Sequence, residues 1–333
     1  MADPVVIVSV ARTPIGAMMG ELSSFAGHQL GAHAIKAAVQ RAGLSPEQVQ
    51  EVIMGCVLPA GQGQAPARQA TLGAGLPTSS GATTINKVCG SGMKAAMLAH
   101  DLLAVGSQDV VVAGGMESMS NAPYLMLKGR GGYRYGHATL FDHMALDGLE
   151  DAYEKTPNGG GKSMGQFAED CAGRYTFTRE EQDRYAIAST ERAKKANTDG
   201  SFAWEIAGLT VAGKKGEVTI DKDESPFKSN IEKIPALKPA FRKDGTVTAA
   251  TSSSISDGAA RWWLIACYRG EDDRVRLRAI AAQKLHLAVQ RIEDVAGIAW
   301  QLDGERLDVA VVNAGVYGLR TSSVQSPPTD EQF

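Results

Sequence analysis

The first 120 residues alternate between short apolar runs and segments with helical spacing. Val5–Val10 is a β-branched run, typical of a strand buried on both faces. Apolar residues then recur at helical spacing from Leu30 to Val39, and Glu51–Met54 has the pattern of a short strand. This alternation predicts an α/β layered domain with parallel strand pairing.

The same alternation continues around a cysteine in the middle of this region. Ala82–Val88 has the pattern of a strand and is followed by Gly90-Ser91-Gly92 and by a helix rich in alanine and methionine that reaches about Ala104. Val110–Ala113 is predicted to be a strand again. Cys89 is therefore expected where a strand ends and a helix begins.

Residues 121–248 differ from the segment before them. Glycine clusters at Gly129–Gly136 and Gly159–Gly165, and the only long helical pattern starts at Arg179 and ends near Asn197. Thr178 and Glu181 form a capping box at its start. Long glycine-rich insertions usually contact ligands or partner subunits, so we interpret 121–248 as an inserted loop domain.

Strand character returns at Thr246–Ala250, and Asp257–Ala260 is predicted to be a turn into an apolar segment. Arg261-Trp262-Trp263 then places a charge beside two large rings, which breaks the pattern. The predicted division is an N-terminal α/β half over 1–120, a loop domain over 121–248, a return strand over 249–265 and a divergent tail over 266–333.

Composition and charge narrow the class of protein. The chain of 333 residues has a formal net charge of -3, which argues against nucleic acid as the main partner. No apolar run approaches the roughly 20 residues of a membrane helix. Its start, Met1–Pro4, has neither a basic region nor a cleavage site. The four cysteines, which show neither CxxC nor metal-ligand spacing, are Cys56, Cys89, Cys171 and Cys267. A reduced cytoplasm and no metal site are expected.

The position of Cys89 is suited to covalent catalysis. A thiolate at a helix start faces free N–H groups and the positive end of the helix dipole, which lowers a thiol pKa. Gly90 and Gly92 allow close approach of a substrate. From these features alone, Cys89 is either an acyl-accepting nucleophile or a small buried apolar residue.

The surrounding motif favours the nucleophile. Asn86–Ala95, Asn-Lys-Val-Cys-Gly-Ser-Gly-Met-Lys-Ala, closely resembles the nucleophile motif of thiolases. The resemblance covers about residues 4–260 and is greatest to acetyl-CoA acetyltransferases. Other segments that resemble the family are Ala11–Gly16, Gly114–Ser120, Lys238–Phe241, Thr246–Ala249 and Ser252–Gly258.

The resemblance implies a thiolase-like layered fold and a ping-pong reaction. Cys89 would accept an acyl group from acyl-CoA and pass it to a second acetyl-CoA or to free CoA. Coenzyme A would be a substrate, with no separate cofactor, and a homodimer or homotetramer is expected. The residues that would line the CoA path are Leu149, Met164, Ala249 and Ser253. By residue type alone, Leu149 and Met164 are typical of a core and Ser253 of a turn. The family often has His where this chain has Ser163.

A complete thiolase has a second, similar half with Asn-Glu-Ala-Phe, Gly-His-Pro and Cys-x-Gly-Gly-Gly segments, and this sequence contains none of them. In the family the His activates the nucleophile and the second Cys moves the α-proton, each a contribution of about 100- to 10,000-fold. The histidines that do not obviously replace them are His28, His100, His137, His143 and His286. Activity is therefore in doubt, and the alternative is a non-catalytic remnant that binds CoA or associates with subunits.

The tail resembles a different family. Leu307–Gly315 is similar to the strand and Asn-Ala-Gly motif of short-chain dehydrogenases, over about residues 268–333. This tail lacks the dinucleotide-binding glycine loop of that family and its later Tyr-x-x-x-Lys pair. We interpret the chain as a fusion or frameshifted reading, with an NAD(P)-dependent oxidoreductase as the weaker alternative function.

Overall fold

The computed structural model describes residues 5–213 and 216–266. The predicted dehydrogenase-like tail lies outside these residues, as do Cys267 and His286.

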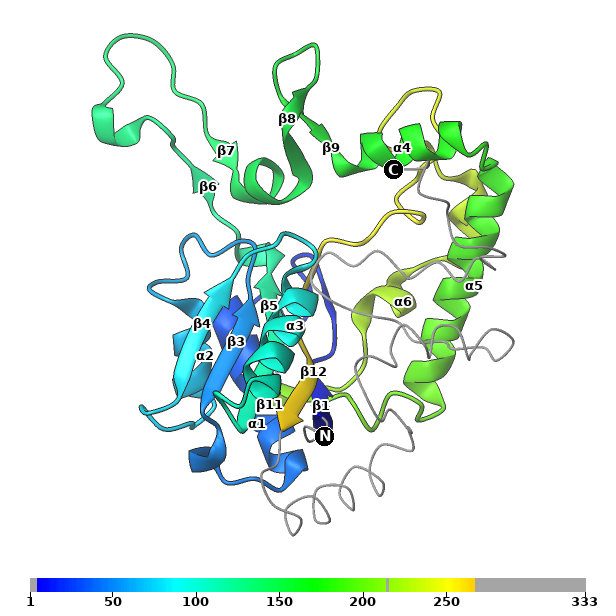
Figure 1. Cartoon of the computed structure of the whole chain (residues 1–333). Helices are drawn as coiled ribbons and strands as arrows, with labels where there is room; N and C mark the ends of the chain where they lie inside the picture. Colours follow the sequence, from blue (N-terminus) through cyan, green and yellow to red (C-terminus); the bar gives the residue numbers. More distant parts are fainter. Residues whose placement is uncertain (1–4, 214–215, 267–333) are drawn as a thin grey trace.

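The core of the molecule is one mixed sheet (Figure 1). Its strand order is β1-β12-β5-β3-β4, and a short β2 pairs with β12. β3 pairs in parallel with β4 and β5, whereas β12 is antiparallel to both β5 and β1. The predicted parallel pairing is confirmed for β3, β4 and β5 and wrong for β1 and β12. The strand bounds are β1 Val6–Arg12, β2 Gly16–Ala17, β3 Glu51–Gly55, β4 Gly81–Ile85, β5 Val110–Ser118 and β12 Ser256–Ala266.

Helices cover both faces of this sheet, as alternating side chains on β3 show. Val52 and Met54 lie in one buried cluster with the apolar side chains of α1 (Gly27–Ala42) and α2 (Pro66–Gly73). Ile53, between them, lies in a second cluster with Ala95 and Ala99 of α3 (Ser91–Ala104). Because successive strand residues point to opposite faces, the sheet separates α1 and α2 from α3. The predicted α/β layered fold is confirmed.

Three local predictions are corrected by backbone hydrogen bonding. The strand predicted over Ala82–Val88 ends at Ile85, because the residues that follow form the turn that carries Cys89. Thr246–Ala250 is not a strand, since the N–H groups of Thr246 and Val247 donate to the Glu169 carboxylate. The turn predicted at Asp257–Ala260 belongs to β12, where its backbone pairs with β5.

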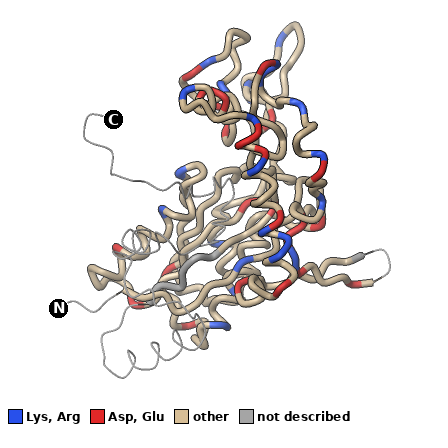
Figure 2. The backbone as a smooth tube through the Cα atoms, turned by 90° about the vertical axis from the view of Figure 1, so that its right-hand side faces the viewer, with Lys and Arg blue, Asp and Glu red and all other residues tan. Residues whose placement is uncertain are grey.

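The loop-rich segment between β5 and β12 contains small hairpins and two longer helices (Figure 1). The predicted helix is confirmed as α5, with its capping box: the Glu181 N–H donates to the Thr178 hydroxyl at 3.2 Å, and the Thr178 N–H to the Glu181 carboxylate at 2.9 Å. Figure 2 shows charges of both signs along these segments. The remaining elements are η1 Pro46–Gln48, η2 Met119–Asn121, β6 Tyr124–Leu125, η3 Gly129–Gly131, β7 Phe141–Asp142, η4 Met144–Leu149, β8 Glu150–Lys155, β9 Gly161–Ser163, α4 Met164–Arg174, α5 Arg179–Thr198, β10 Leu209–Gly213, β11 Gly216–Ile220, α6 Glu224–Lys228 and η5 Ile231–Ala236.

Within the described ranges, no helix is both long and apolar enough to cross a membrane. The domain boundaries proposed at residues 120, 248 and 265 stay predictions.

Candidate active site

Side-chain hydrogen bonds fix the turn between β4 and α3. The Ser91 hydroxyl accepts the N–H of Lys87 at 2.9 Å and donates to the carbonyl of Val88 at 2.6 Å. The Asn86 side-chain oxygen accepts the N–H of Val88 at 2.8 Å. Val88 itself has a φ of 46°, a backbone conformation that β-branched residues rarely adopt. The turn thus holds Cys89 in a defined place at the start of α3.

A glycine brings the end of β3 against this turn. A side chain at Gly55 would place its Cβ only 2.5 Å from the Cβ of Ser91. The absence of a side chain at Gly55 therefore allows the segment after β3 to lie beside Cys89.

Cys89 is half-buried and lines a small, mostly apolar pocket. The other residues that line it are Val57, Leu58, Val88, Glu117, Met119, Gly148 and Leu149. Leu58 and Met119 are buried, and Val57 and Leu149 pack against them. A pocket of this kind keeps water away from a reacting sulfur and accepts a short apolar group.

The protonation state of Cys89 differs from the prediction. Burial raises the pKa of its thiol, and its own backbone N–H opposes that rise to a lesser extent. The expected lowering by the helix start is wrong, because the N–H groups of Gly90 and Ser91 donate to the carbonyls of Lys87 and Val88. Cys89 is therefore mostly a neutral thiol at pH 7 and needs a proton acceptor to react. Among the pocket residues in the part of the chain that the structure describes, none is a histidine.

A buried carboxylate forms one wall of the pocket. Glu117, at 2% exposure, accepts the N–H of Val57 at 2.7 Å and the N–H of Leu58 at 3.1 Å. Its own pKa is raised by burial, which these two N–H groups partly oppose. Burial and this carboxylate raise the pKa of the Cys56 thiol to about 12. Cys56 stays protonated and does not compete with Cys89 as a nucleophile.

We did not predict Glu117 as a site residue from the sequence. A signal was present, because Glu117 is a charged residue that directly follows the apolar strand sequence Val110–Met116. A carboxylate in such a position is buried and needs hydrogen-bond donors.

The structure places the other predicted site residues in two groups. Leu149, the last residue of η4, shares the pocket with Cys89. Met164 begins α4, while Ala249 and Ser253 are exposed on the segment that leads to β12. These three do not line the Cys89 pocket, and their roles stay predictions. Ser163, at the position where the family often has His, caps α4 by accepting the Gln166 N–H at 3.4 Å.

The histidines in the described ranges do not line the Cys89 pocket. His143 is held by two hydrogen bonds: its Nδ1 bonds the Asp147 carboxylate at 2.6 Å, and its Nε2 accepts the Ala60 N–H at 3.4 Å. Because the N–H of Ala60 needs an acceptor, Nδ1 carries the proton. His143 is buried and both of its ring nitrogens have hydrogen-bond partners, as expected for a structural residue.

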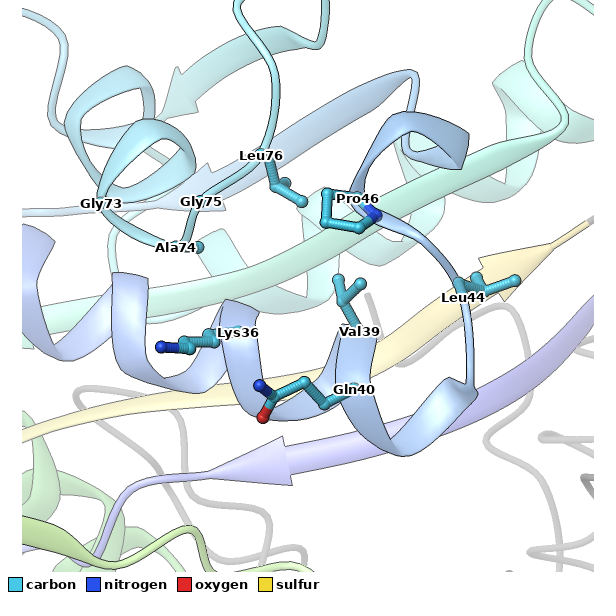
Figure 3. Close-up of a pocket in the computed structure, with 9 residues that line it drawn as sticks. All are labelled: Lys36, Val39, Gln40, Leu44, Pro46, Gly73, Ala74, Gly75 and Leu76. Carbon is cyan, nitrogen blue, oxygen red and sulfur yellow. The ribbon is translucent and has the colours of Figure 1, made fainter.

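A larger cavity, of about 330 Å³, lies elsewhere on the molecule (Figure 3). It is bounded by the C-terminal half of α1, by Leu44 and Pro46, and by residues 73–76 at the end of α2. Lys36 is the charged residue in its lining, and the lining contains no thiol or carboxylate. Size alone does not make it a reaction site, so the smaller pocket at Cys89 is the candidate.

Comparison with known proteins identifies the family. Residues 5–266 match the family described as thiolase, N-terminal domain, so the match ends at 266 and not at the predicted 260. The mitochondrial acetyl-CoA acetyltransferase A of Xenopus laevis is 54% identical over 260 residues, which are 78% of this chain and 60% of that protein. The cytosolic acetyl-CoA acetyltransferase ERG10 of Gibberella zeae is 48% identical over 259 residues, or 77% and 64% of the two chains.

A solved structure agrees with the sequence matches. The Acat5 thiolase from Ascaris suum, crystallised in complex with coenzyme A, superposes with a TM-score of 0.74 and 39% identity, covering 82% of this chain and 68% of that one. The chain thus spans 60% to 64% of the length of the two relatives above. These matches give no support to the dehydrogenase resemblance predicted for residues 268–333.

Proposed function

Because this chain belongs to the thiolase family, we propose that it is an acyl-CoA acyltransferase, an acetyl-CoA C-acetyltransferase that works through an acyl-enzyme on Cys89. The observation that supports this most directly is the place of Cys89. It is held at the start of α3 by a locked turn and faces an apolar pocket that it shares with Leu149.

The first step forms a thioester on the enzyme. The Cys89 sulfur gives up its proton and attacks the carbonyl carbon of acetyl-CoA, the carbon–sulfur bond to CoA breaks, and CoA leaves as a thiol after taking up a proton. The apolar walls exclude the water that would hydrolyse the acetyl-enzyme. In the second step an acetyl-CoA that has lost its α-proton attacks the acetyl carbonyl carbon, the bond from that carbon to the Cys89 sulfur breaks, and acetoacetyl-CoA leaves while the sulfur takes up a proton. In the degradative direction free CoA attacks the same carbon through its sulfur, and acetyl-CoA leaves in the same way.

Both steps need proton transfer, and the raised pKa of Cys89 makes the first transfer essential. The thiolase resemblance assigns these roles to a histidine and a second cysteine of a following half. The described residues supply the nucleophile and the pocket.

We assign the CoA path to Leu149, Met164, Ala249 and Ser253. Two contacts support a continuous path. Ile255, two residues after Ser253, packs with Leu149 against the cluster under the pocket. Glu169 of α4 holds the segment just before Ala249 by accepting two of its backbone N–H groups. CoA is a substrate in this proposal, with no resident cofactor.

A homodimer or homotetramer in the cytoplasm completes the proposal. Support for the location is divided, since one relative is named as cytosolic and another as mitochondrial.

Intact mass spectrometry tests the proposal. Pure protein is incubated with acetyl-CoA, beside the variants Cys89→Ala and Cys171→Ala; Cys171 is a matched control because it is also half-buried. We expect one acetyl adduct in the wild type and in Cys171→Ala and none in Cys89→Ala, with acetoacetyl-CoA cleaved on addition of CoA. An adduct that persists in Cys89→Ala would refute Cys89 as the nucleophile.

A second function, CoA binding without turnover, is favoured by one observation: none of the described pocket residues is a histidine that could accept the proton of Cys89. A stable adduct without acetoacetyl-CoA cleavage would identify it. Quenching of NADH fluorescence would instead support the oxidoreductase alternative.

A further inference from the structure

We propose that Glu117 is a positioning residue for the acylation of Cys89, acting through the peptide groups of Val57. The inference rests on the proposed function and adds a residue to it. Glu117 lies on β5, Val57 follows β3, and Cys89 follows β4. The three residues therefore come from three neighbouring strands, and all of them line the pocket.

The first contact is between the carboxylate and the pocket wall. The Val57 N–H donates to one Glu117 oxygen at 2.7 Å, and the Leu58 N–H donates to the other at 3.1 Å. Val57 and Leu58 both line the pocket. Two donors on two oxygens fix the position and the rotation of this short segment, which a single bond would not.

The second contact is between the same segment and the nucleophile turn. The carbonyl of Val57 accepts the Asn86 side-chain N–H at 3.4 Å, and the side-chain oxygen of Asn86 accepts the N–H of Val88 at 2.8 Å. Val88 directly precedes Cys89. A continuous set of hydrogen bonds therefore runs from Glu117 through Val57 and Asn86 to the residue before the nucleophile.

Burial of the charged Glu117 carboxylate costs free energy, and its hydrogen bonds offset that cost. At 2% exposure beside apolar side chains, a carboxylate is stable only when donors surround it. The Cys56 thiol, 3.6 Å from one oxygen, adds a weak third donor. A glutamine of the same shape would turn one NH₂ group, a donor, toward the N–H of Val57 or Leu58. That replacement loosens the wall without changing its volume.

The chain contains a matched carboxylate for comparison. Glu224 is also buried and also accepts two backbone N–H groups, those of Ala17 at 2.8 Å and Glu21 at 3.0 Å, although both bind one oxygen and the other oxygen pairs with Lys228. None of these residues lines the Cys89 pocket. Glu224→Gln therefore removes a buried carboxylate outside the site, while the glutamine oxygen can still accept both N–H groups.

The test compares two reactions of Cys89 in the full chain. Acetylation by acetyl-CoA requires the thioester to be aligned by the pocket wall, whereas alkylation by iodoacetamide requires an accessible, ionised thiol and no such alignment. Both rates are measured by peptide mass spectrometry for the wild type, Glu117→Gln and Glu224→Gln, with thermal unfolding as a check on folding. We expect Glu117→Gln to acetylate at least about tenfold more slowly, with alkylation within about twofold of wild type, because 1 Å of misplacement is enough to cost such a factor. Glu224→Gln should match the wild type in both reactions.

A second variant tests the route of the effect. Asn86 is exposed, and Asn86→Asp removes the donor to Val57 while keeping the acceptor for Val88. It should slow acetylation in the same selective manner. In the double variant with Glu117→Gln, the slowing should be smaller than the product of the two single effects, because both changes loosen the same peptide.

The outcomes separate the inference from the proposed function. Acetylation of Glu117→Gln at the wild-type rate would overturn the inference and leave the function standing. Parallel changes in acetylation and alkylation would also overturn it, since they would indicate a general loss of structure. If Glu117→Gln does not fold, a wild-type acetylation rate in Asn86→Asp overturns the inference by itself. A wild type that never acetylates would refute the function, and the inference with it.

Discussion

The guanidinium of Arg12 donates to both carboxylate oxygens of Asp223, at 2.6 and 3.0 Å, and to Glu205 at 2.6 Å. Arg12 ends β1, and Asp223 directly precedes α6, so these bonds tie the first strand to the loop-rich segment. Arg12 and Asp223 are buried, and the Arg12 guanidinium also lies 4.8 Å from the centre of the Phe202 ring. The arrangement is a bidentate ion pair largely out of contact with water.

We expect Arg12→Ala to lower the free energy of unfolding by about 3–5 kcal/mol, because it leaves a buried Asp223 carboxylate without its partner. Urea denaturation followed by fluorescence measures the change. Lys162→Ala is the control, since its ion pairs with Glu154 and Asp170 have largely exposed partners and should contribute nothing measurable. Equal loss of stability in the two variants would contradict the assignment.

The left-handed backbone at Val88 predicts a substitution that raises, and does not lower, the free energy of unfolding. A β-branched residue with a φ of 46° carries strain of about 1–3 kcal/mol, and asparagine tolerates this conformation better. Val88 is 47% exposed, so Val88→Asn loses little packing and should raise the free energy of unfolding by about 1 kcal/mol. Urea denaturation midpoints provide the measurement.

Val105→Asn is the matched control for Val88→Asn. Val105 is 78% exposed at the end of α3 and has an ordinary φ of -83°. The same substitution there relieves no strain and should give no gain. A similar gain at both positions would show that the effect comes from the asparagine side chain and not from the backbone of Val88.

The sequence predicts those parts of the fold whose interacting residues are close together along the chain. The core of β3 and the helix from Ser91 were predicted because their apolar periodicity is local. The antiparallel entry of β12 between β1 and β5 was missed, since pairing between residue 260 and residues 12 and 115 leaves no local pattern. Sequence patterns do not carry strand order.

In the candidate site, too, local features were predicted and long-range contacts were missed. Cys89 was identified from a continuous motif, and the structure places Leu149 in its pocket. Its pKa was predicted in the wrong direction, because the sequence shows that a helix begins at Ser91 but not that the N–H groups of Gly90 and Ser91 are already used within the turn. Glu117 was missed since its donors come from Val57 and Leu58, which lie about 60 positions earlier in the chain.

The raised pKa of Cys89 predicts how its reactivity depends on pH. The thiolate is the reactive form, and a pKa above the ordinary thiol value leaves only a small thiolate fraction at pH 7. Below the pKa that fraction grows roughly tenfold for each pH unit, so the rate of alkylation by iodoacetamide should rise about tenfold between pH 7 and pH 8. The rate is measured on the peptide that contains Cys89.

Cys56 serves as the internal control in that experiment. Its thiol, with a pKa of about 12 and buried at 1% exposure, should stay unmodified over the same range. A Cys89 rate that does not change between pH 6 and pH 8 would mean that the thiolate is already formed. That result would indicate that the start of α3 does stabilise the Cys89 thiolate, in spite of the hydrogen bonds within the turn.

The proposed CoA path is tested by a charge placed on its exposed segment. Ala249 is exposed beside the part of the chain that Glu169 holds against α4. Ala249→Asp adds bulk and a negative charge where the phosphates and pantetheine of CoA are expected to pass, so binding should weaken at least about tenfold, or 1.4 kcal/mol. Isothermal titration with CoA measures the dissociation constant. Ala203, which is also exposed, lies in the turn after α5, and Ala203→Asp makes the same change away from this segment, so it should bind CoA like the wild type. If both variants bind equally well, CoA does not pass Ala249. If both weaken equally, the effect is one of overall charge, and the path assigned to Ala249 and Ser253 is wrong.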